Sequence, residues 1–410
     1  MSIFQRVDPV STSAFRACPV CSGTECAPLH AQRFVLPEGH PLAQGYSVVA
    51  CQHCGFVYAD TDVTEQRFDD FYASRSKYED SQLGTGGGGS PWDRRRLADT
   101  AQALAAAFDH DVRVLDIGCA NGGLLGELYH AGFTNLTGVD PSPVCVKNTR
   151  AHGFAAHQGC LPNLPDIGKF DLVIVSHVLE HLLDPGESLV ALAKILRNGG
   201  SIYAEVPDAA RYHEFLVAPF QDFNTEHINH FSPVCLTNLF ARCGCERTAG
   251  GIKTIASSAD SLTPAVFGIY RKVDGEPAPP ARDERLPLAI GEYIQGSQQL
   301  LNEIDRHLRE SLSPEEHVVI WGTGQLTMKL LCETVLERHT VAAFVDSNPV
   351  HQGDMFHGVP VLSPQQLQER GLTEPIIIGS LLHGREIVTG IRERYHLPNT
   401  LIQLRPEVLA

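Results

Sequence analysis

Short apolar runs alternate with longer amphipathic stretches between residues 91 and 247. The apolar runs predict strands and the amphipathic stretches predict helices. Strands are expected at 112–117, 136–139, 170–176 and 201–206, and helices at 94–108, 123–131, 143–152 and 185–196. The sequence Asn198-Gly199-Gly200 is expected to end the last helix, because glycine is common just beyond a helix C-terminus. This region therefore predicts parallel βαβ units, with helices covering the sheet.

A second, shorter alternation lies near the end of the chain. Residues 276–284 are rich in proline and charge and predict a linker. A long helix is expected at 286–312, followed by strands at 318–321, 341–345 and 375–379 and a helix at 326–336. The chain is therefore expected to be an α/β protein that contains two Rossmann-like units.

The composition is that of an acidic folded protein. The 410 residues suggest two or three domains, and 43% of them are hydrophobic. The formal net charge of −16 argues against non-specific binding to nucleic acid or to anionic membranes. Neither a signal peptide nor an apolar run of about 18 residues stands out in the sequence. We therefore expect a cytoplasmic monomer that binds neither nucleic acid nor membrane.

A strand, a glycine turn and a helix follow one another in the segment VLDIGCANG at 114–122. Glycine lets the backbone approach a ligand closely, and a helix start can face that ligand. The G-x-x-x-G spacing of Gly118 and Gly122 differs from the G-x-G-x-x-G spacing of dinucleotide sites. The next predicted strand ends in Asp140, whose carboxylate can accept hydrogen bonds from both hydroxyls of a ribose. These residues predict a cofactor site at this strand edge.

This ordered set resembles the class I S-adenosylmethionine-dependent methyltransferases over roughly residues 95–245. The resemblance implies cofactor contacts from Asp116, Gly118, Cys119, Gly122, Asp140, Pro141, Cys160, Leu161, Ser176 and His177. Asp116 would face the methionine part of the cofactor, and Asp140 would bind the ribose. Cys160 is a departure, because the family commonly has an acidic residue at this adenine contact. The alternative is a Rossmann unit for another ligand such as NAD, which Asp116 and the glycine spacing oppose.

Two C-x-x-C pairs precede the methyltransferase-like region. Cys18 and Cys21 form the first pair, and Cys51 and Cys54 form the second. Four thiolates complete a closed tetrahedral shell around Zn²⁺, so the pairs predict a structural zinc site. A set of reduced cysteines or a redox pair is the alternative. Cys26 is a fifth cysteine and is not expected to be a ligand.

Histidines gather in two further segments. Glu226, His227 and His230 follow the last predicted strand of the sheet, and His177 and His181 follow the strand before it. Ligands bind at the carboxyl edge of such sheets, and a glutamate beside an imidazole could orient it as a general base. The alternatives are histidines that only pack or form hydrogen bonds, and a metal site.

The order of these parts resembles the C-methyltransferases of deoxysugar biosynthesis. The resemblance implies a zinc-binding domain at 1–80, a Rossmann-like methyltransferase core at 91–275, and a helix with a C-terminal Rossmann-like domain at 286–410. It also implies a small-molecule substrate, a nucleotide-linked keto sugar, which loses a proton beside its ketone and is then methylated on carbon.

The same resemblance implies catalytic roles for His227, Glu226, His181, Tyr78 and Tyr72. His227 would be the base, paired with Glu226, while Tyr72 or Tyr78 would supply a tyrosine to the pocket. The family usually has a second tyrosine at the position of Asn224. Sugar O-methyltransferases also carry the Glu-His-x-x-His-Phe pattern, so methylation of a hydroxyl on a sugar or another metabolite is an alternative. A non-catalytic scaffold that binds S-adenosylmethionine is a third.

The C-terminal unit contains another glycine turn. Gly322 and Gly324 are followed by Thr327 where a dinucleotide site would have its third glycine, and Asp346 ends the next strand. A second nucleotide cofactor is one interpretation. We favour a domain that helps to hold the substrate or is only structural.

Overall fold

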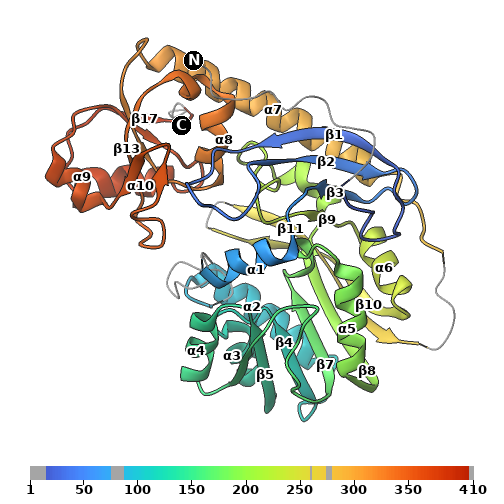
Figure 1. The fold of residues 1–410 in the computed structure, drawn as a ribbon. Coiled ribbons are helices and arrows are strands. Elements are labelled where there is room, and N and C mark those ends of the chain that lie inside the picture. Colours follow the sequence, from blue (N-terminus) through green and yellow to red (C-terminus); the bar gives the residue numbers. More distant parts are fainter. Residues whose placement is uncertain (1–14, 75–86, 259–260, 274–278, 406–410) are drawn as a thin grey trace. The chain divides into compact units, whose positions relative to one another are not determined.

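The computed structural model describes residues 15–74, 87–258, 261–273 and 279–405 (Figure 1). The chain divides into two compact units, which we describe separately. The first comprises Met1–Ala31, Tyr46–Tyr212 and Glu226–Ile290, and the second comprises Gln32–Gly45, His213–Thr225 and Gly291–Ala410.

The first unit contains a seven-stranded sheet in the order β10-β11-β8-β7-β4-β5-β6 (Figure 1). Its strands are β4 (Arg113–Ile117), β5 (Asn135–Asp140), β6 (Ala155–Gln158), β7 (Phe170–Ser176), β8 (Leu196–Pro207), β10 (Cys245–Ala256) and β11 (Leu262–Lys272). Strands β6, β5, β4, β7 and β8 are parallel, whereas β11 pairs with β8 and β10 in antiparallel register. The expected Rossmann-like α/β fold is confirmed, and the β10–β11 hairpin adds an antiparallel edge.

The order in which the chain adds strands to the sheet reverses between β4 and β7. From β4 the chain proceeds outward through β5 to β6, and it then returns to place β7 on the other side of β4. Open α/β sheets bind ligands beyond the carboxyl ends of their strands at such a switch point. The fold therefore predicts a ligand site at the segments that follow Ile117 and Ser176.

The helices of this unit start where the sequence supplies caps. They are α2 (Pro91–Ala105), α3 (Gly123–His130), α4 (Pro143–Ala151), α5 (Pro185–Ile195) and α6 (Pro233–Arg242). Ser90, Ser142 and Ser232 accept hydrogen bonds from the first turns of α2, α4 and α6, and each is followed by proline. The helices expected at 94–108, 123–131 and 143–152 correspond to α2, α3 and α4.

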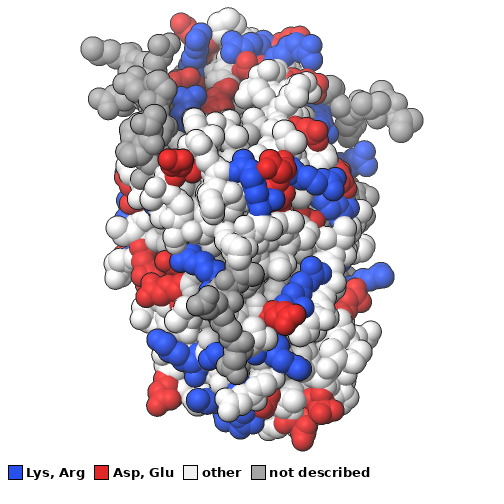
Figure 2. Space-filling model, turned by 90° about the vertical axis from the view of Figure 1, so that its right-hand side faces the viewer, with Lys and Arg blue, Asp and Glu red and all other residues white. Residues whose placement is uncertain are grey.

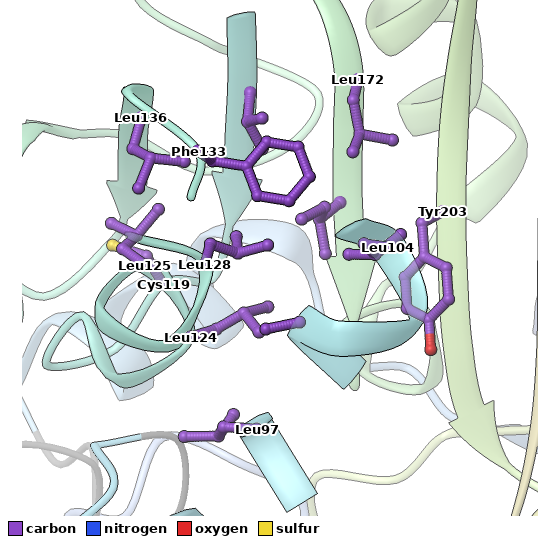
Figure 3. Packing of buried hydrophobic residues seen from close by; sticks show 13 residues of the cluster. Leu97, Leu104, Cys119, Leu124, Leu125, Leu128, Phe133, Leu136, Leu172 and Tyr203 are labelled. Carbon is purple, nitrogen blue, oxygen red and sulfur yellow. The ribbon is translucent and has the colours of Figure 1, made fainter. Parts of the chain in front are cut away.

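A buried cluster joins α2 and α3 to the sheet (Figure 3). Leu97 and Leu104 from α2 pack with Leu125 from α3 against Leu172 of β7 and Tyr203 of β8. These side chains are at most 3% exposed. Removing this apolar surface from water stabilises the layer that holds the glycine turn in place.

Gly199 does not end helix α5, contrary to the expectation. The helix stops at Ile195, and Leu196 already adopts an extended conformation as the first residue of β8. Leu196 pairs with Phe170 while Ser201 pairs with Leu172, so four residues of β8 loop out between them. Gly199 has φ +77° within this irregularity. The glycines therefore serve a strand bulge rather than a helix cap.

A second sheet of the same unit has the order β1-β2-β3-β9. It consists of β1 (Cys26–Arg33), β2 (Gly45–Cys51), β3 (Val57–Asp60) and the short β9 (Asn229–His230), and α1 (Glu65–Ser74) follows β3. Val57 pairs with His230 and Tyr58 with Asn229. The segment that carries Glu226 and His227 is therefore attached to this second sheet, through the pairing of β9 with β3.

The second unit has a six-stranded sheet in the order β14-β15-β13-β12-β16-β17. Its elements are α7 (Leu286–Ser311), β12 (Val318–Trp321), α8 (Gln325–Glu333), β13 (Val341–Val345), β14 (Met355–Phe356), β15 (Val359–Leu362), α9 (Pro364–Arg370), β16 (Ile376–Ile378), α10 (Gly384–Thr389) and β17 (Leu401–Gln403). The helix expected at 326–336 ends early. Thr334 is extended, and its hydroxyl donates to the carbonyl of Leu330 at 2.6 Å, so a separate short turn follows.

Candidate functional site

A cavity of about 400 Å³ opens within the first unit, at the carboxyl ends of the strands. This volume is in the range of small-molecule and cofactor sites. Its wall includes Glu65, Phe68, Asp69 and Tyr72 of α1, the loop residues Gly118, Ala120, Asp140, Pro141, Cys160 and Leu161, and Ser176, His177, Glu180, His181 and His227. Most residues that the sequence singled out for the cofactor and for catalysis thus surround one space.

The glycine turn after β4 needs its glycines. Gly118 has φ +71°, and a Cβ there would lie 2.9 Å from Val178 Cγ2. Gly122 has φ +82°, and a Cβ there would lie 3.1 Å from Thr149 Cγ2. Left-handed backbone and close approach both favour glycine, so the G-x-x-x-G spacing reflects the geometry of the turn.

Asp140 is fixed by the backbone around it. Its Oδ2 accepts the N–H of Ala120 at 2.9 Å, and its Oδ1 accepts the N–H of Ser142 at 2.9 Å. A carboxylate has about four acceptor sites, so each oxygen retains capacity for a ligand hydroxyl. Asp140 lines the cavity at the end of β5, as a ribose-binding acid should.

Asp116 lies in β4 and is only 3% exposed. Burial and, to a smaller extent, the nearby charge of Asp140 together raise the pKa of Asp116 to about 8, against an opposing effect of Arg96. Asp116 is therefore neutral at pH 7 in the ligand-free protein, and a nearby cationic ligand would favour its ionised form.

We expect Asp116→Asn to stabilise the ligand-free protein increasingly as the pH rises. Between pH 4 and 8 the folded protein retains a proton that the unfolded chain has released, so the unfolding free energy of the parent falls with pH. The penalty is on the order of 4 kcal/mol at pH 7, and the amide variant escapes it. Urea unfolding of both proteins at pH 5, 6, 7 and 8 measures the difference. If the difference in unfolding free energy between the two proteins stays constant from pH 5 to 8, the raised pKa of Asp116 is wrong.

The remaining expected cofactor residues divide into two groups. Pro141, Cys160, Leu161, Ser176 and His177 line the cavity. Cys119 is 2% exposed and belongs to the buried cluster of α2 and α3, and its backbone N–H donates to the carbonyl of Val139 at 3.1 Å. Gly122 shapes the turn from outside the wall. Cys119 and Gly122 therefore act on the shape of the loop.

Tyr72, His181 and His227 form a contiguous cluster in the cavity wall. The Tyr72 hydroxyl lies 2.9 Å from His181 Nδ1, and the His181 and His227 rings meet edge to face at 4.9 Å. His181 Nδ1 also lies 3.1 Å from the backbone carbonyl of Glu226. A carbonyl oxygen only accepts hydrogen bonds, so Nδ1 carries the proton and Nε2 keeps the lone pair in a neutral ring. His181 is thus arranged to accept a proton at Nε2.

Hydrogen bonds join the two segments that carry these histidines. The N–H of Ile228 donates to the carbonyl of Glu180 at 2.9 Å. The Asn229 side-chain amide donates to the carbonyls of Leu179 at 2.9 Å and Leu182 at 2.6 Å. The positions of His181 and His227 are therefore fixed by backbone contacts between residues far apart in the sequence.

His177 bridges two buried acids. Its Nδ1 lies 3.3 Å from Glu180 Oε1 and its Nε2 lies 3.2 Å from Glu205 Oε1. Burial alone would lower the pKa of His177, but Glu180 and Glu205 raise it above its ordinary value. Lys253 Nζ lies 2.5 Å from Glu205 Oε2 and completes the ionic group. This arrangement holds Glu180 beside His181, whose Nε2 lies 3.9 Å from Glu180 Oε1.

The other catalytic candidates are placed differently. Glu226 is 5% exposed and is not among the residues that line the cavity, and its carbonyl rather than its carboxylate meets His181. Tyr78 lies outside the described residues. Glu180, His181 and His227 also offer ligand atoms within 4.8 Å of one another, so the histidine cluster is compatible with a metal ion as well as with a base.

Helix α1 was missed as a wall of the cavity. Only Tyr72 was expected there, whereas Glu65, Phe68 and Asp69 also line the space. The signal was present in the spacing 65, 68, 69 and 72, which places all four side chains on one face of a helix.

Cys18, Cys21, Cys51 and Cys54 bring their sulfur atoms together. All four lie within 4.8 Å of one another, with 3.6 Å between Cys18 and Cys54 and 3.5 Å between Cys21 and Cys51. Zn–S bonds of about 2.3 Å place tetrahedral thiolates roughly 3.8 Å apart, and a disulfide would need about 2.05 Å. Gly55 closes the second pair with φ +77°, and a Cβ there would collide with the carbonyl of Asp283. The donor set fits a closed zinc shell.

The glycine turn of the second unit is satisfied by its own chain. Asp346 accepts hydrogen bonds from the Thr323 N–H at 2.9 Å, the Thr323 hydroxyl at 2.6 Å and the Asn348 N–H at 2.9 Å. The Thr327 hydroxyl donates to the carbonyl of Gly322 at 2.6 Å. These contacts stabilise the turn without a ligand.

The family comparison agrees with the site. Residues 92–249 match the model of a methyltransferase domain. These residues are a methyltransferase domain. They include the glycine turn, both acidic residues and the histidine segments, while the cysteine cluster, α1 and the second unit apart from His213–Thr225 lie outside the match.

Curated relatives share only part of their length with this chain. A ubiquinone biosynthesis O-methyltransferase from Caulobacter vibrioides is 36% identical over 128 residues, which are 26% of this chain and 49% of the relative. A tRNA U34 carboxymethyltransferase from Shewanella piezotolerans is 31% identical over 126 residues, covering 28% of this chain and 36% of the relative. The chain thus spans about half or less of the length of these two relatives.

Solved structures resemble the chain weakly. Magnesium protoporphyrin IX methyltransferase from Synechocystis PCC 6803 with bound SAH has 15% identity and a TM-score of 0.36, over 44% of this chain and 83% of that one. A SAM-dependent methyltransferase from Methanosarcina mazei has 17% identity and a TM-score of 0.34, over 42% of this chain and 98% of that one. Scores this low support no conclusion about activity.

Two surface properties complete the description. Among the described residues, no helix has both the length and the apolar character needed to cross a membrane. On the face drawn in Figure 2, lysine and arginine side chains are interspersed with aspartate and glutamate.

Proposed function

We propose that this chain is an S-adenosylmethionine-dependent methyltransferase that methylates a small molecule, with a nucleotide-linked keto sugar as the leading substrate and carbon as the site of methylation. The observation that carries the proposal is the cavity lined by the glycine turn, by Asp140 and by the cluster of Tyr72, His181 and His227. The turn and Asp140 suit a cationic methyl donor, and the cluster suits the removal of a proton.

The residues at the glycine turn fit the methyl donor. Asp140 offers acceptor capacity to ribose hydroxyls, and the raised pKa of Asp116 marks a buried acid that gains from a nearby cation. When bound, S-adenosylmethionine supplies an electrophilic methyl group on a positively charged sulfur. Residues of the chain hold the methyl donor and the acceptor, exclude water and move a proton.

The histidine cluster would remove the proton of the acceptor. In the carbon route His227 takes a proton from the carbon beside the ketone, and the C–H electron pair forms an enolate. That carbon would then bond to the methyl group as the bond between the methyl group and the donor sulfur breaks, leaving its electron pair on sulfur. His181 is the second base, because its Nδ1 proton is fixed and its Nε2 is available. Glu180 stabilises positive charge on His181, and Tyr72 holds its ring.

Methylation of a hydroxyl is the second candidate function. The same histidines can take the proton of a hydroxyl group, and Asn224 replaces the tyrosine typical of the carbon-methylating family. The ubiquinone relatives that match the domain are named as O-methyltransferases. Solvent deuterium distinguishes the two routes. Incorporation at the substrate carbon without cofactor supports the carbon route, whereas a substrate that is turned over without such incorporation supports the oxygen route.

We expect the protein to bind S-adenosylhomocysteine and Asp140→Ala to lose most of that affinity. Two charge-assisted hydrogen bonds to ribose hydroxyls correspond to roughly a 100-fold change in the dissociation constant. Isothermal titration calorimetry measures both affinities. Asp171→Asn is the control, because Asp171 pairs with Arg197 on β8, outside the cavity wall. If the folded parent protein does not bind S-adenosylhomocysteine, the proposed function is wrong. If Asp140→Ala binds it with the parental affinity, the assignment of Asp140 to ribose binding is wrong.

The remaining parts are proposed to support this activity. The cysteine cluster would hold a structural Zn²⁺, with no open coordination position for catalysis. We propose a zinc-binding domain at 1–80, the methyltransferase core at 91–275 and a Rossmann-like domain at 286–410 that helps to hold the substrate or is structural.

A further inference from the structure

One face of α1 forms a wall of the cavity although the helix lies outside the methyltransferase domain. Figure 1 shows α1 beside α2, near the carboxyl ends of the sheet strands. The family match begins at residue 92, and α1 ends at Ser74. A segment that precedes the domain in sequence therefore meets whatever the cavity binds.

Asp69 of α1 meets the end of β6. Cys160 follows that strand, and its thiol donates a hydrogen bond to Asp69 Oδ1 at 3.5 Å. Burial, together with the Asp69 carboxylate, raises the pKa of Cys160 to about 11, so the thiol keeps its proton at neutral pH. The thiol fills one of the roughly four acceptor sites of the carboxylate. Asp69 can therefore accept further donors from inside the cavity.

The order of the strands indicates which ligand part reaches Asp69. Strands β4, β5 and β6 are neighbours; Gly118 follows β4, Asp140 is the last residue of β5, and Cys160 lies two residues beyond β6. A ligand whose amino-acid part lies at the glycine turn and whose ribose lies at Asp140 extends its base toward the third strand. The base would then lie between Cys160 and α1.

We infer that Asp69 recognises the adenine of S-adenosylmethionine by accepting a hydrogen bond from its exocyclic amine. The inference rests on the proposed function and assigns to α1 the acid that is missing at Cys160. An adenine edge presents an amine donor beside a ring-nitrogen acceptor. The Asp69 carboxylate offers the acceptor that this amine needs, while the Cys160 thiol donates to the same carboxylate. Phe68 and Leu161, which are 6% and 5% exposed, supply apolar surface for the ring.

The test compares two ligands that differ at this amine. S-inosylhomocysteine has a carbonyl oxygen where S-adenosylhomocysteine has the amine. The Asp69 carboxylate should therefore accept a hydrogen bond from the amine of the adenosyl ligand and repel the carbonyl oxygen of the inosyl ligand. Calorimetry with both ligands is applied to the full-length parent, to Asp69→Asn and to Asp70→Asn. Asp70 is the matched control, because it is the next residue of α1, is exposed, and accepts from Gln66 Nε2 at 2.9 Å.

We expect the parent to prefer the adenosyl ligand by roughly 10- to 100-fold. Asp69→Asn should weaken adenosyl binding by a similar factor and largely abolish the preference, because an amide can donate to the inosyl carbonyl. Asp70→Asn should match the parent. Parental affinity and preference in Asp69→Asn would overturn the inference while leaving the proposed function intact, and so would an equal loss for both ligands. A parent that binds neither ligand overturns both.

Discussion

His227→Ala is expected to lower the rate of methyl transfer by roughly 100- to 10,000-fold while leaving the affinity for S-adenosylhomocysteine within about twofold. The proton of the acceptor must leave before or during transfer, and His227 and His181 line the cavity together with Tyr72 and contact each other. Single-turnover rates with an accepted keto sugar measure the loss. Calorimetry shows whether binding is spared.

His181→Ala and His130→Ala extend this test. His181 contacts both Tyr72 and the backbone of Glu226, so its removal should be comparably damaging if the two imidazoles act as a unit. His130 is exposed at the end of α3 and should give the parental rate. Parental rates in both active-site variants would contradict the proposed roles of the two histidines, whereas a parent that binds S-adenosylmethionine but transfers no methyl group would favour the scaffold hypothesis. Activity that chelation abolishes and added Mg²⁺ or Mn²⁺ restores would favour the metal interpretation of Glu180, His181 and His227.

The second large effect concerns the cysteine cluster. Cys54→Ser is expected to reduce bound zinc from about one ion per chain to less than 0.5 and to lower the free energy of unfolding by several kcal/mol. Structural zinc contributes roughly 10 kcal/mol or more in isolated zinc-binding peptides, so losing one of four ligands is costly. Metal analysis and urea unfolding measure the two quantities.

Cys26→Ser is the matched control for this experiment. Cys26 begins β1 and lies near the cluster without belonging to it, so its zinc content should equal that of the parent. If the parent contains little zinc after careful purification, the zinc proposal is wrong. A reversible change in thiol content on oxidation and reduction would then support the redox alternative.

Much of the methyltransferase fold could be predicted from residue patterns. Buried strands such as 170–176 are continuous apolar runs, and the helices after Ser90, Ser142 and Asp184 start with a capping residue and a proline. These signals are local, so one sequence is enough to detect them. Gly199 was misjudged because its role depends on the pairing of Leu196 with Phe170, which is not a local property.

The site was predicted where a motif carries it and missed where distant segments meet. Gly118, Asp116 and Asp140 follow from the spacing around one strand. Asp69 and Cys160 are 91 positions apart, and nothing in either segment indicates that they touch. The contact between Tyr72 and His181 spans 109 positions. Such pairs depend on how α1 packs on the strand ends, which requires the three-dimensional structure.

The cavity wall has two origins. The glycine turn belongs to the matched methyltransferase domain, whereas α1 and strand β3 of the β3–β9 pairing come from a segment that precedes it. A protein cut down to residues 91–275 would keep the glycine turn but lose Tyr72 and Asp69. Exchange of the preceding segment would therefore change one side of the cavity wall while leaving the glycine turn intact.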